Sequence, residues 1–162
     1  MQITTAIVCG AIAVSAIVGC TPTPPPNPSA TTGTDSPATT IDLAQVGCQF
    51  IETEAQNYQY RPSKAEDCQR INAETLSTRQ PQFKPLELKA GEYIFKVTNR
   101  DVPYEVGFYL RGAGVGLATL PKVSGGGLTP GTTQEYRVTL KPGEYAISCP
   151  LNPTPDYPLV VR

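Results

Sequence analysis

Alternating apolar and polar positions in the second half of the chain predict a β-rich domain. Residues 93–97 (YIFKV) and 136–140 (YRVTL) alternate well enough to be half-buried antiparallel strands. Glycine and proline separate these short runs, and residues 90–91 and 141–143 supply turns. The expected strands span residues 83–88, 93–98, 104–110, 133–140, 144–149 and 157–161. This spacing is typical of an all-β sandwich.

The segment before these strands, residues 41–80, has a mixed pattern. The run at 63–66 (SKAE) is a capping-box signature, which predicts a helix continuing through Cys68, Ile71 and Leu76. Residues 41–162 are an ordinary length for one domain with its own core. We therefore expect a single domain, in which residues 41–80 form a short mixed or helical N-terminal extension.

A glycine-rich stretch lies between residues 111 and 131, with GAGVG at 112–116 and GGG at 125–127. It lacks the strand-to-helix context of a dinucleotide-binding fingerprint. We interpret it as a long loop rather than as a phosphate-binding site.

The N-terminus has the pattern of an export signal. Residues 6–19 are uncharged and apolar or small, a run too short for a membrane span. The run ends in IVGC at 17–20, which resembles the bacterial lipobox, so we expect residues 1–19 to be a signal peptide and Cys20 to carry lipid, including palmitate. Because residues 1–5 contain no Lys or Arg, an uncleaved anchor helix is the alternative. Both readings place the rest of the chain outside the cytoplasm, in the periplasm or a similar space.

Residues 20–40 follow as a Pro- and Thr-rich linker. Such a composition cannot offset the entropy of ordering the chain, and its prolines favour an extended, semi-rigid tether. A proline-rich docking peptide is the alternative.

Composition excludes several classes of function. The net charge is −1 and there is no basic run, so nucleic acid is not an expected partner. The chain has no His, and its one Met is Met1. The commonest general base and the commonest metal ligand are therefore missing, and we expect no enzymatic activity. Carboxylates at loop ends, at Asp101, Glu105 and Asp156, are interpreted as solvated.

Three cysteines remain once Cys9 and Cys20 are assigned to the signal peptide and the lipid. In an oxidising compartment we expect Cys48 and Cys68 to pair, because they enclose a short segment ahead of the strands. Cys149 is then a free thiol.

Four motifs follow one another in a recognisable order: LELKAG at 86–91, VTN at 97–99, VPYEV at 102–106 and GEYAISCP at 143–150. They resemble the motifs of the cupredoxins, the blue-copper proteins, over residues 83–161. The resemblance implies a Greek-key β-sandwich. It places Cys149 at the copper thiolate, Tyr104 and Asn152 at the two His ligands, and Tyr157 at the axial Met.

Three of these four ligand positions are therefore altered. A blue-copper centre needs two imidazoles and a thiolate, and the chain has no His. We expect no cofactor, with Tyr104, Asn152 and Tyr157 filling the former pocket and Cys149 buried beside them. The alternatives are a non-standard copper, zinc or iron site at Cys149, or a thiol-redox role.

Our leading hypothesis is a metal-free, lipid-anchored binding or assembly module that presents loops at one end of the sandwich to an envelope or membrane-complex protein. One candidate loop, stiffened by prolines, contains Leu151 and Pro153, and the other is the glycine-rich loop with Leu117 and Leu120. The alternative is electron transfer or copper binding around Cys149.

Overall fold

The structure, a computed structural model, describes residues 37–54 and 56–162. The expected signal peptide, Cys20 and the linker as far as residue 36 lie outside this part of the chain. The first strand, β1, spans Thr39–Val46 and therefore starts two residues before residue 41.

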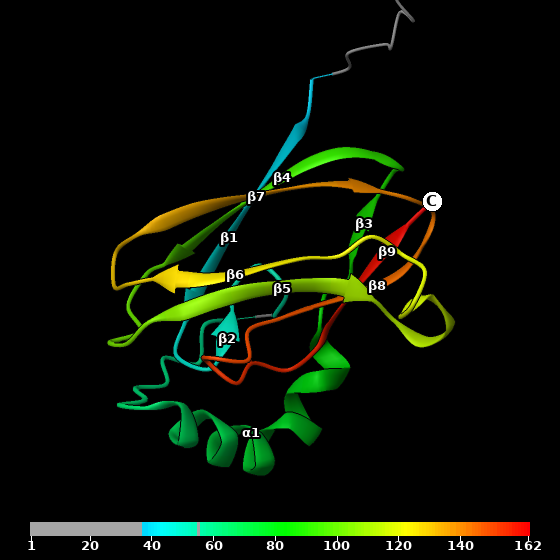
Figure 1. Ribbon diagram of the computed structural model, residues 1–162. Coiled ribbons are helices and arrows are strands. Elements are labelled where there is room, and N and C mark those ends of the chain that lie inside the picture. The colour runs from blue at the N-terminus through cyan, green and yellow to red at the C-terminus, as the bar shows by residue number, and fades with distance from the viewer. Residues whose placement is uncertain (1–36, 55) are drawn as a thin grey trace, which may run out of the picture. The chain divides into compact units, whose positions relative to one another are not determined.

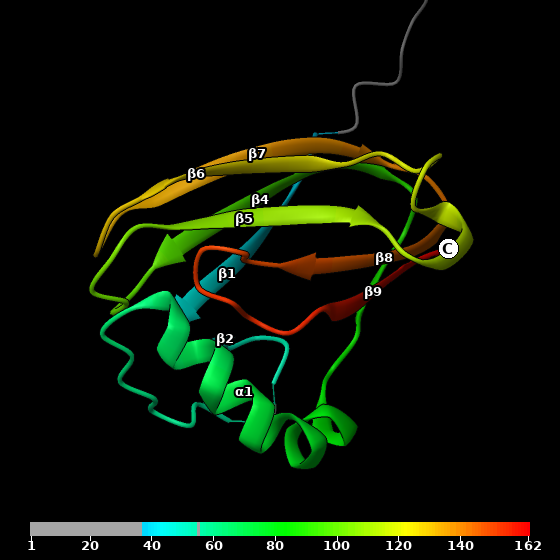
Figure 2. The same cartoon turned by 60° about the horizontal axis from the view of Figure 1, so that its bottom comes forward.

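Two packed sheets form the domain (Figures 1 and 2). In the four-stranded sheet the order is β2-β1-β4-β7, and in the five-stranded sheet it is β3-β9-β8-β5-β6. Two neighbouring pairs, β1 with β4 and β3 with β9, run parallel, and the others run antiparallel. The remaining strands are β2 (Gln49–Phe50), β3 (Leu86–Leu88), β4 (Gly91–Asn99), β5 (Val106–Gly112), β6 (Val123–Leu128), β7 (Thr133–Leu140), β8 (Gly143–Ser148) and β9 (Tyr157–Val161).

Alternating side chains build the core between the sheets. In β4, Phe95 and Val97 are buried while Lys96 between them is exposed. The Phe95 ring packs against Phe108 of the opposite sheet, with 5.5 Å between centroids, and Phe108 lies 5.1 Å from the ring of Tyr136. Each such aromatic side chain contributes about 1.5 to 3 kcal/mol when fully buried. The predicted fold class, an all-β sandwich with a helical N-terminal extension, is confirmed.

The helical part of the extension is α1 (Ala65–Arg79), followed by the short helix η1 (Gln80–Gln82). The helix was expected from its capping signature, but its cap uses Asp67 rather than Glu66. The Asp67 carboxylate accepts hydrogen bonds from the backbone N–H groups of Ser63 (2.9 Å) and Lys64 (3.3 Å), which holds the pKa of Asp67 below its usual value. No helix in the described part of the chain is long and apolar enough to cross a membrane.

The glycine-rich stretch is more ordered than expected. Instead of one long loop it contains the short helix η2 (Gly114–Gly116) and the strand β6. The strand was missed because three of its residues are glycines, which carry no side-chain pattern. β6 approaches β5 so closely that position 107 on β5 also requires a glycine, since a Cβ atom on Gly107 would lie 2.5 Å from the carbonyl oxygen of Gly125.

Candidate functional site

The Cys149 thiol lies directly after β8 and is completely buried. Its sulfur accepts hydrogen bonds from two backbone N–H groups, those of Gly107 on β5 and Asn152 in the following loop, each at 3.2 Å. Burial raises the pKa of the thiol, and the N–H donors only partly oppose this effect. Cys149 is therefore a neutral, enclosed thiol.

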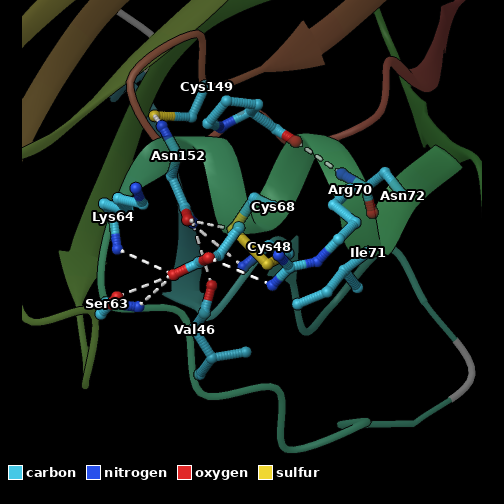
Figure 3. The surroundings of a disulfide bond; sticks show 12 residues. Val46, Cys48, Ser63, Lys64, Cys68, Arg70, Ile71, Asn72, Cys149 and Asn152 are labelled. Carbon is cyan, nitrogen blue, oxygen red and sulfur yellow. Dashed lines mark hydrogen bonds and ion pairs between the residues drawn. A yellow bond between two sulfur atoms is a disulfide. The ribbon is translucent and has the colours of Figure 1, made fainter.

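Asn152 is the centre of the hydrogen-bond network beside this thiol (Figure 3). Its Oδ1 accepts hydrogen bonds from the backbone N–H of Cys48 (3.2 Å) and from the hydroxyl of Tyr104 (3.1 Å). Its Nδ2 donates to the carbonyl of Val46 (3.0 Å) and to Oε1 of Gln45 (3.5 Å). Both lone-pair directions of the oxygen and both amide protons are thus engaged, so the side chain has no free donor or acceptor for a ligand.

The predicted disulfide is confirmed and borders this network. Cys48 and Cys68 are joined, with their Cα atoms 5.0 Å apart, and Cys149 is a free cysteine in the described part of the chain. The Asn152 Oδ1 lies 3.3 Å from Cys68 Sγ, a contact rather than a hydrogen bond because a disulfide sulfur has no proton. The extension therefore closes the site, with Cys48 in the β1–β2 turn and Cys68 on α1.

Removing this disulfide is expected to destabilise the domain. The variant Cys48→Ser, Cys68→Ser should lose about 3 kcal/mol of unfolding free energy, because the bridge closes a segment of the unfolded chain with a sequence separation of 20 residues. Urea denaturation of the variant and of the oxidised wild type measures the difference. A Cys149→Ser variant is the control, since it leaves the bridge intact; an unchanged midpoint for the double variant would contradict the expectation.

Tyr104 and Tyr157 have different surroundings. Tyr104 is half-buried in the Asn152 network, and burial, with a smaller effect from Cys149, raises its pKa to about 12, so its hydroxyl remains a neutral donor. Tyr157 was expected in the same pocket, but its hydroxyl instead donates a hydrogen bond to the carboxylate of Glu54. Its ring packs against Phe50 and Phe83, with centroids 5.9 and 4.8 Å away. The structure thus brings together three of the four positions that the resemblance identified.

Sequence reasoning missed a buried charged pair in the extension. Glu54 and Arg79 are almost fully buried, and Glu54 Oε2 lies 3.8 Å from Arg79 Nε. The guanidinium carbon of Arg79 lies 5.4 and 5.3 Å from the ring centroids of Tyr58 and Tyr60. Burial raises the pKa of Glu54 and outweighs both the Tyr157 hydrogen bond and the charge of Arg79. No sequence pattern marks this pair, because charged residues in such a segment are normally exposed.

The residues around Cys149 do not fit a copper ion. No group of three or more Cys, Asp or Glu side chains in the described ranges is arranged to hold a metal, and the whole chain lacks His. Cys149 is completely buried, and Asn152 is fully hydrogen-bonded. Both features suit a closed pocket.

The loop after Cys149 is partly available to a partner. Leu151 is 45% exposed and borders an open groove of about 610 Å³. Pro153 is less available, because its carbonyl accepts a hydrogen bond from the side chain of Asn72 on α1. The groove is lined by Gly107, Tyr109, Lys122, Ser124, Pro150 and Leu151.

The second expected partner loop lies elsewhere. Leu117 is exposed, but Leu120 is partly buried and packs against the core. A Cβ atom on Gly143, the first residue of β8, would lie 2.7 Å from Leu120, whereas Leu151 lies in the loop that follows the last residue of β8, Ser148. The two loops are therefore separated by the length of that strand, about 20 Å. The expectation that both loops face one end of the sandwich is wrong.

Comparison with known proteins gave matches among solved structures. No family model and no curated protein match the chain. Auracyanin B matches with a TM-score of 0.49 and 14% identity, over 79% of this chain and 91% of that chain. An oxidised mutant of amicyanin matches with a TM-score of 0.34 and 20% identity, over 48% of this chain and 69% of that one. The reduced Cu(I) form of a second amicyanin mutant gives 0.34 and 19%, over 49% and 72%. These proteins are cupredoxins.

Proposed function

We propose that this chain is a metal-free, cupredoxin-like binding module, exported and held at a bacterial envelope membrane through lipid on Cys20. One observation carries the proposal. Asn152, which stands where the resemblance places a copper ligand, is fully engaged with the turn and the disulfide of the extension. A side chain held in this way acts as a structural tie between two parts of the domain.

The carboxylates near the site have structural partners, and no catalytic role is proposed for them. Asp101 pairs with Arg61 at 3.3 Å, and Asp156 pairs with Arg111 at 2.6 Å. Glu105 accepts a hydrogen bond from the backbone N–H of a glycine on β6 at 2.8 Å.

The second candidate function is metal binding or electron transfer at Cys149. The two N–H donors on its sulfur favour it, because such hydrogen bonds stabilise a thiolate. Its burial and the absence of His in the chain oppose it.

Elemental analysis separates the two candidates. Protein purified from its native envelope is expected to contain copper, zinc and iron well below one atom per chain. Added Cu(II) should produce no thiolate charge-transfer absorption. Stoichiometric metal that disappears in a Cys149→Ser variant would establish the second candidate and remove the first.

The partner surface of the module is the groove beside Leu151. A loop rich in proline loses little entropy when it binds, and the exposed Leu151 side chain can insert into an apolar pocket of an envelope protein. The groove adds the backbone of β6 and the Lys122 side chain at its edge.

Site-specific photo-crosslinking in the native envelope tests this surface. A photoreactive amino acid at Leu151 is expected to give one defined protein adduct. The same probe at Lys96, exposed on the outer face of β4, should give none. Equal adducts from both positions, or none from Leu151, would contradict the assignment.

A further inference from the structure

We infer that the loop around η2, residues 113–120, rests on the lipid bilayer and orients the domain on the membrane. The inference extends the proposed function, because it rests on the lipid anchor at Cys20. The surface consists of the exposed apolar tip of this loop and the lysines around it.

The tip of the loop exposes aliphatic side chains. Val115 is fully exposed and Leu117 is 59% exposed. Together with Leu151 they are the exposed large hydrophobic residues of the described part of the chain. Two of the three thus lie within one short segment. Exposing aliphatic groups to water is unfavourable, and inserting them into the boundary of the bilayer removes them from water.

The loop lies at the end of the sandwich where the chain enters the domain. Thr39, the first residue of β1, pairs with Tyr93 near the start of β4, and Gly91 pairs with Leu140 at the end of β7. The turn after Leu140 leads into Gly143, against which Leu120 of the η2 loop packs. In Figure 1 this loop is seen beyond the ends of β5 and β8, on the opposite side from the turn between β6 and β7.

Positive charge accompanies the apolar tip. Lys89 and Lys141 are exposed in the two turns at this end. Of the nearby acidic side chains, Glu92 pairs with Arg137 at 3.6 Å and Glu87 with Arg162 at 3.8 Å, which leaves Glu144 as the exposed opposing charge. Lysines around an apolar tip favour a surface that contains anionic lipids.

The tether permits this contact. Residues 21–36 separate Cys20 from the described domain, a length that spans up to about 50 Å at roughly 3 Å per residue. The domain can therefore approach the bilayer closely. With the η2 loop on the lipid, Leu151, which lies beyond the other end of β8, is away from the membrane and accessible to a partner.

Tryptophan fluorescence tests the orientation, since the chain has no Trp of its own. Lipidated Leu117→Trp and Leu151→Trp proteins are reconstituted into vesicles of phosphatidylethanolamine and phosphatidylglycerol that contain brominated acyl chains. Leu117→Trp is expected to shift to shorter wavelength and to be quenched severalfold more than Leu151→Trp. Equal quenching, or stronger quenching at Leu151→Trp, would overturn the inference.

Labelling the cells that express the protein with radioactive palmitate shows whether Cys20 carries lipid, and so separates a failure of the proposed anchor from a failure of the membrane contact. If Cys20 carries no lipid, the proposed anchor fails, and the loop is then tested with Cys20→Ser protein mixed with the same vesicles. The inference is supported if the double variant Val115→Asp, Leu117→Asp binds the vesicles at least severalfold less than the Cys20→Ser protein does. The variant Leu151→Asp should bind them as well as that protein. No binding, or equal losses in both variants, overturns it.

Discussion

Replacing Asn152 with Leu is expected to lower the free energy of unfolding by about 2 to 6 kcal/mol. The two side chains have similar volumes, so the change removes hydrogen bonds rather than creating a large cavity. The N–H of Cys48 and the carbonyl of Val46 lose their Asn152 partners in a buried site. Each unsatisfied buried group costs about 1 to 3 kcal/mol. Urea denaturation of oxidised protein measures the loss.

Two control variants define the source of this loss. Asn57→Ala removes an exposed hydrogen bond to the backbone N–H of Gln59 and should change stability by less than about 0.5 kcal/mol. Tyr104→Phe removes one donor to Asn152 and should cost about 0.5 to 1.5 kcal/mol. A loss in Asn152→Leu no larger than in Tyr104→Phe would show that the amide does not tie the extension to the sandwich.

Replacing Arg79 with Met is expected to cost about 3 to 5 kcal/mol at neutral pH. The change leaves the Glu54 carboxylate buried without its positive partner and removes the guanidinium from the rings of Tyr58 and Tyr60. The matched control is Arg137→Met, which breaks an exposed pair with Glu92 and should cost no more than about 0.5 kcal/mol. Equal losses in the two variants would contradict the assigned role of the buried pair.

The cost of Arg79→Met is expected to depend on pH. The pKa of Glu54 is raised above its ordinary value of 4.5, so the folded protein binds this proton more tightly than the unfolded chain. The resulting stability is fully present below pH 4.5 and is lost as the pH rises through the raised pKa. Without Arg79 the pKa of Glu54 is higher still, so the variant continues to lose unfolding free energy at pH values where the wild type no longer does. Denaturation at a series of pH values should therefore show the gap in unfolding free energy between variant and wild type widening as the pH rises above 4.5.

Local patterns in the sequence are sufficient to predict much of this fold. The alternation in β4 and β7 places Phe95 and Val138 in the core, and the signature before α1 marks the start of that helix. The spacing of Cys48 and Cys68 leads to the disulfide. Each of these features depends on residues that are close in the chain, so a reading of short segments detects it.

Three strands escape such a reading: β2, which has only two residues, and β1 and β6, which depend on partners elsewhere in the chain. β1 pairs in parallel with β4, so that Thr39 lies opposite Tyr93. The threonines at the start of β1 resemble in composition the Thr-rich linker that precedes them. β6 is built largely of glycines that β5 approaches closely, so it has no alternation to read. Long-range contacts override local propensity at both places.

The pocket around Cys149 was only partly predictable for the same reason. The cupredoxin resemblance identifies the positions Tyr104, Cys149 and Asn152 but contains no information on the extension, which lies outside it. The partners of Asn152 on β1 and of Tyr157 at Glu54 both come from that extension. These contacts join residues far apart in the chain: Asn152 and Val46 are separated by 106 positions, and Tyr157 and Glu54 by 103.

The position of β1 has a mechanical consequence for a domain held by its N-terminal side. β1 lies between β2 and β4, and each residue from Thr39 to Gln45 has a partner on β4. If lipid on Cys20 anchors the domain as proposed, a pull from the membrane acts along this strand, and the evenly spaced bonds of a parallel pair then share the force in shear. An edge strand pulled sideways would instead release its bonds one after another. A force on a bound partner would therefore load the hydrogen bonds between β1 and β4 in shear, the direction in which the sheet best resists unfolding.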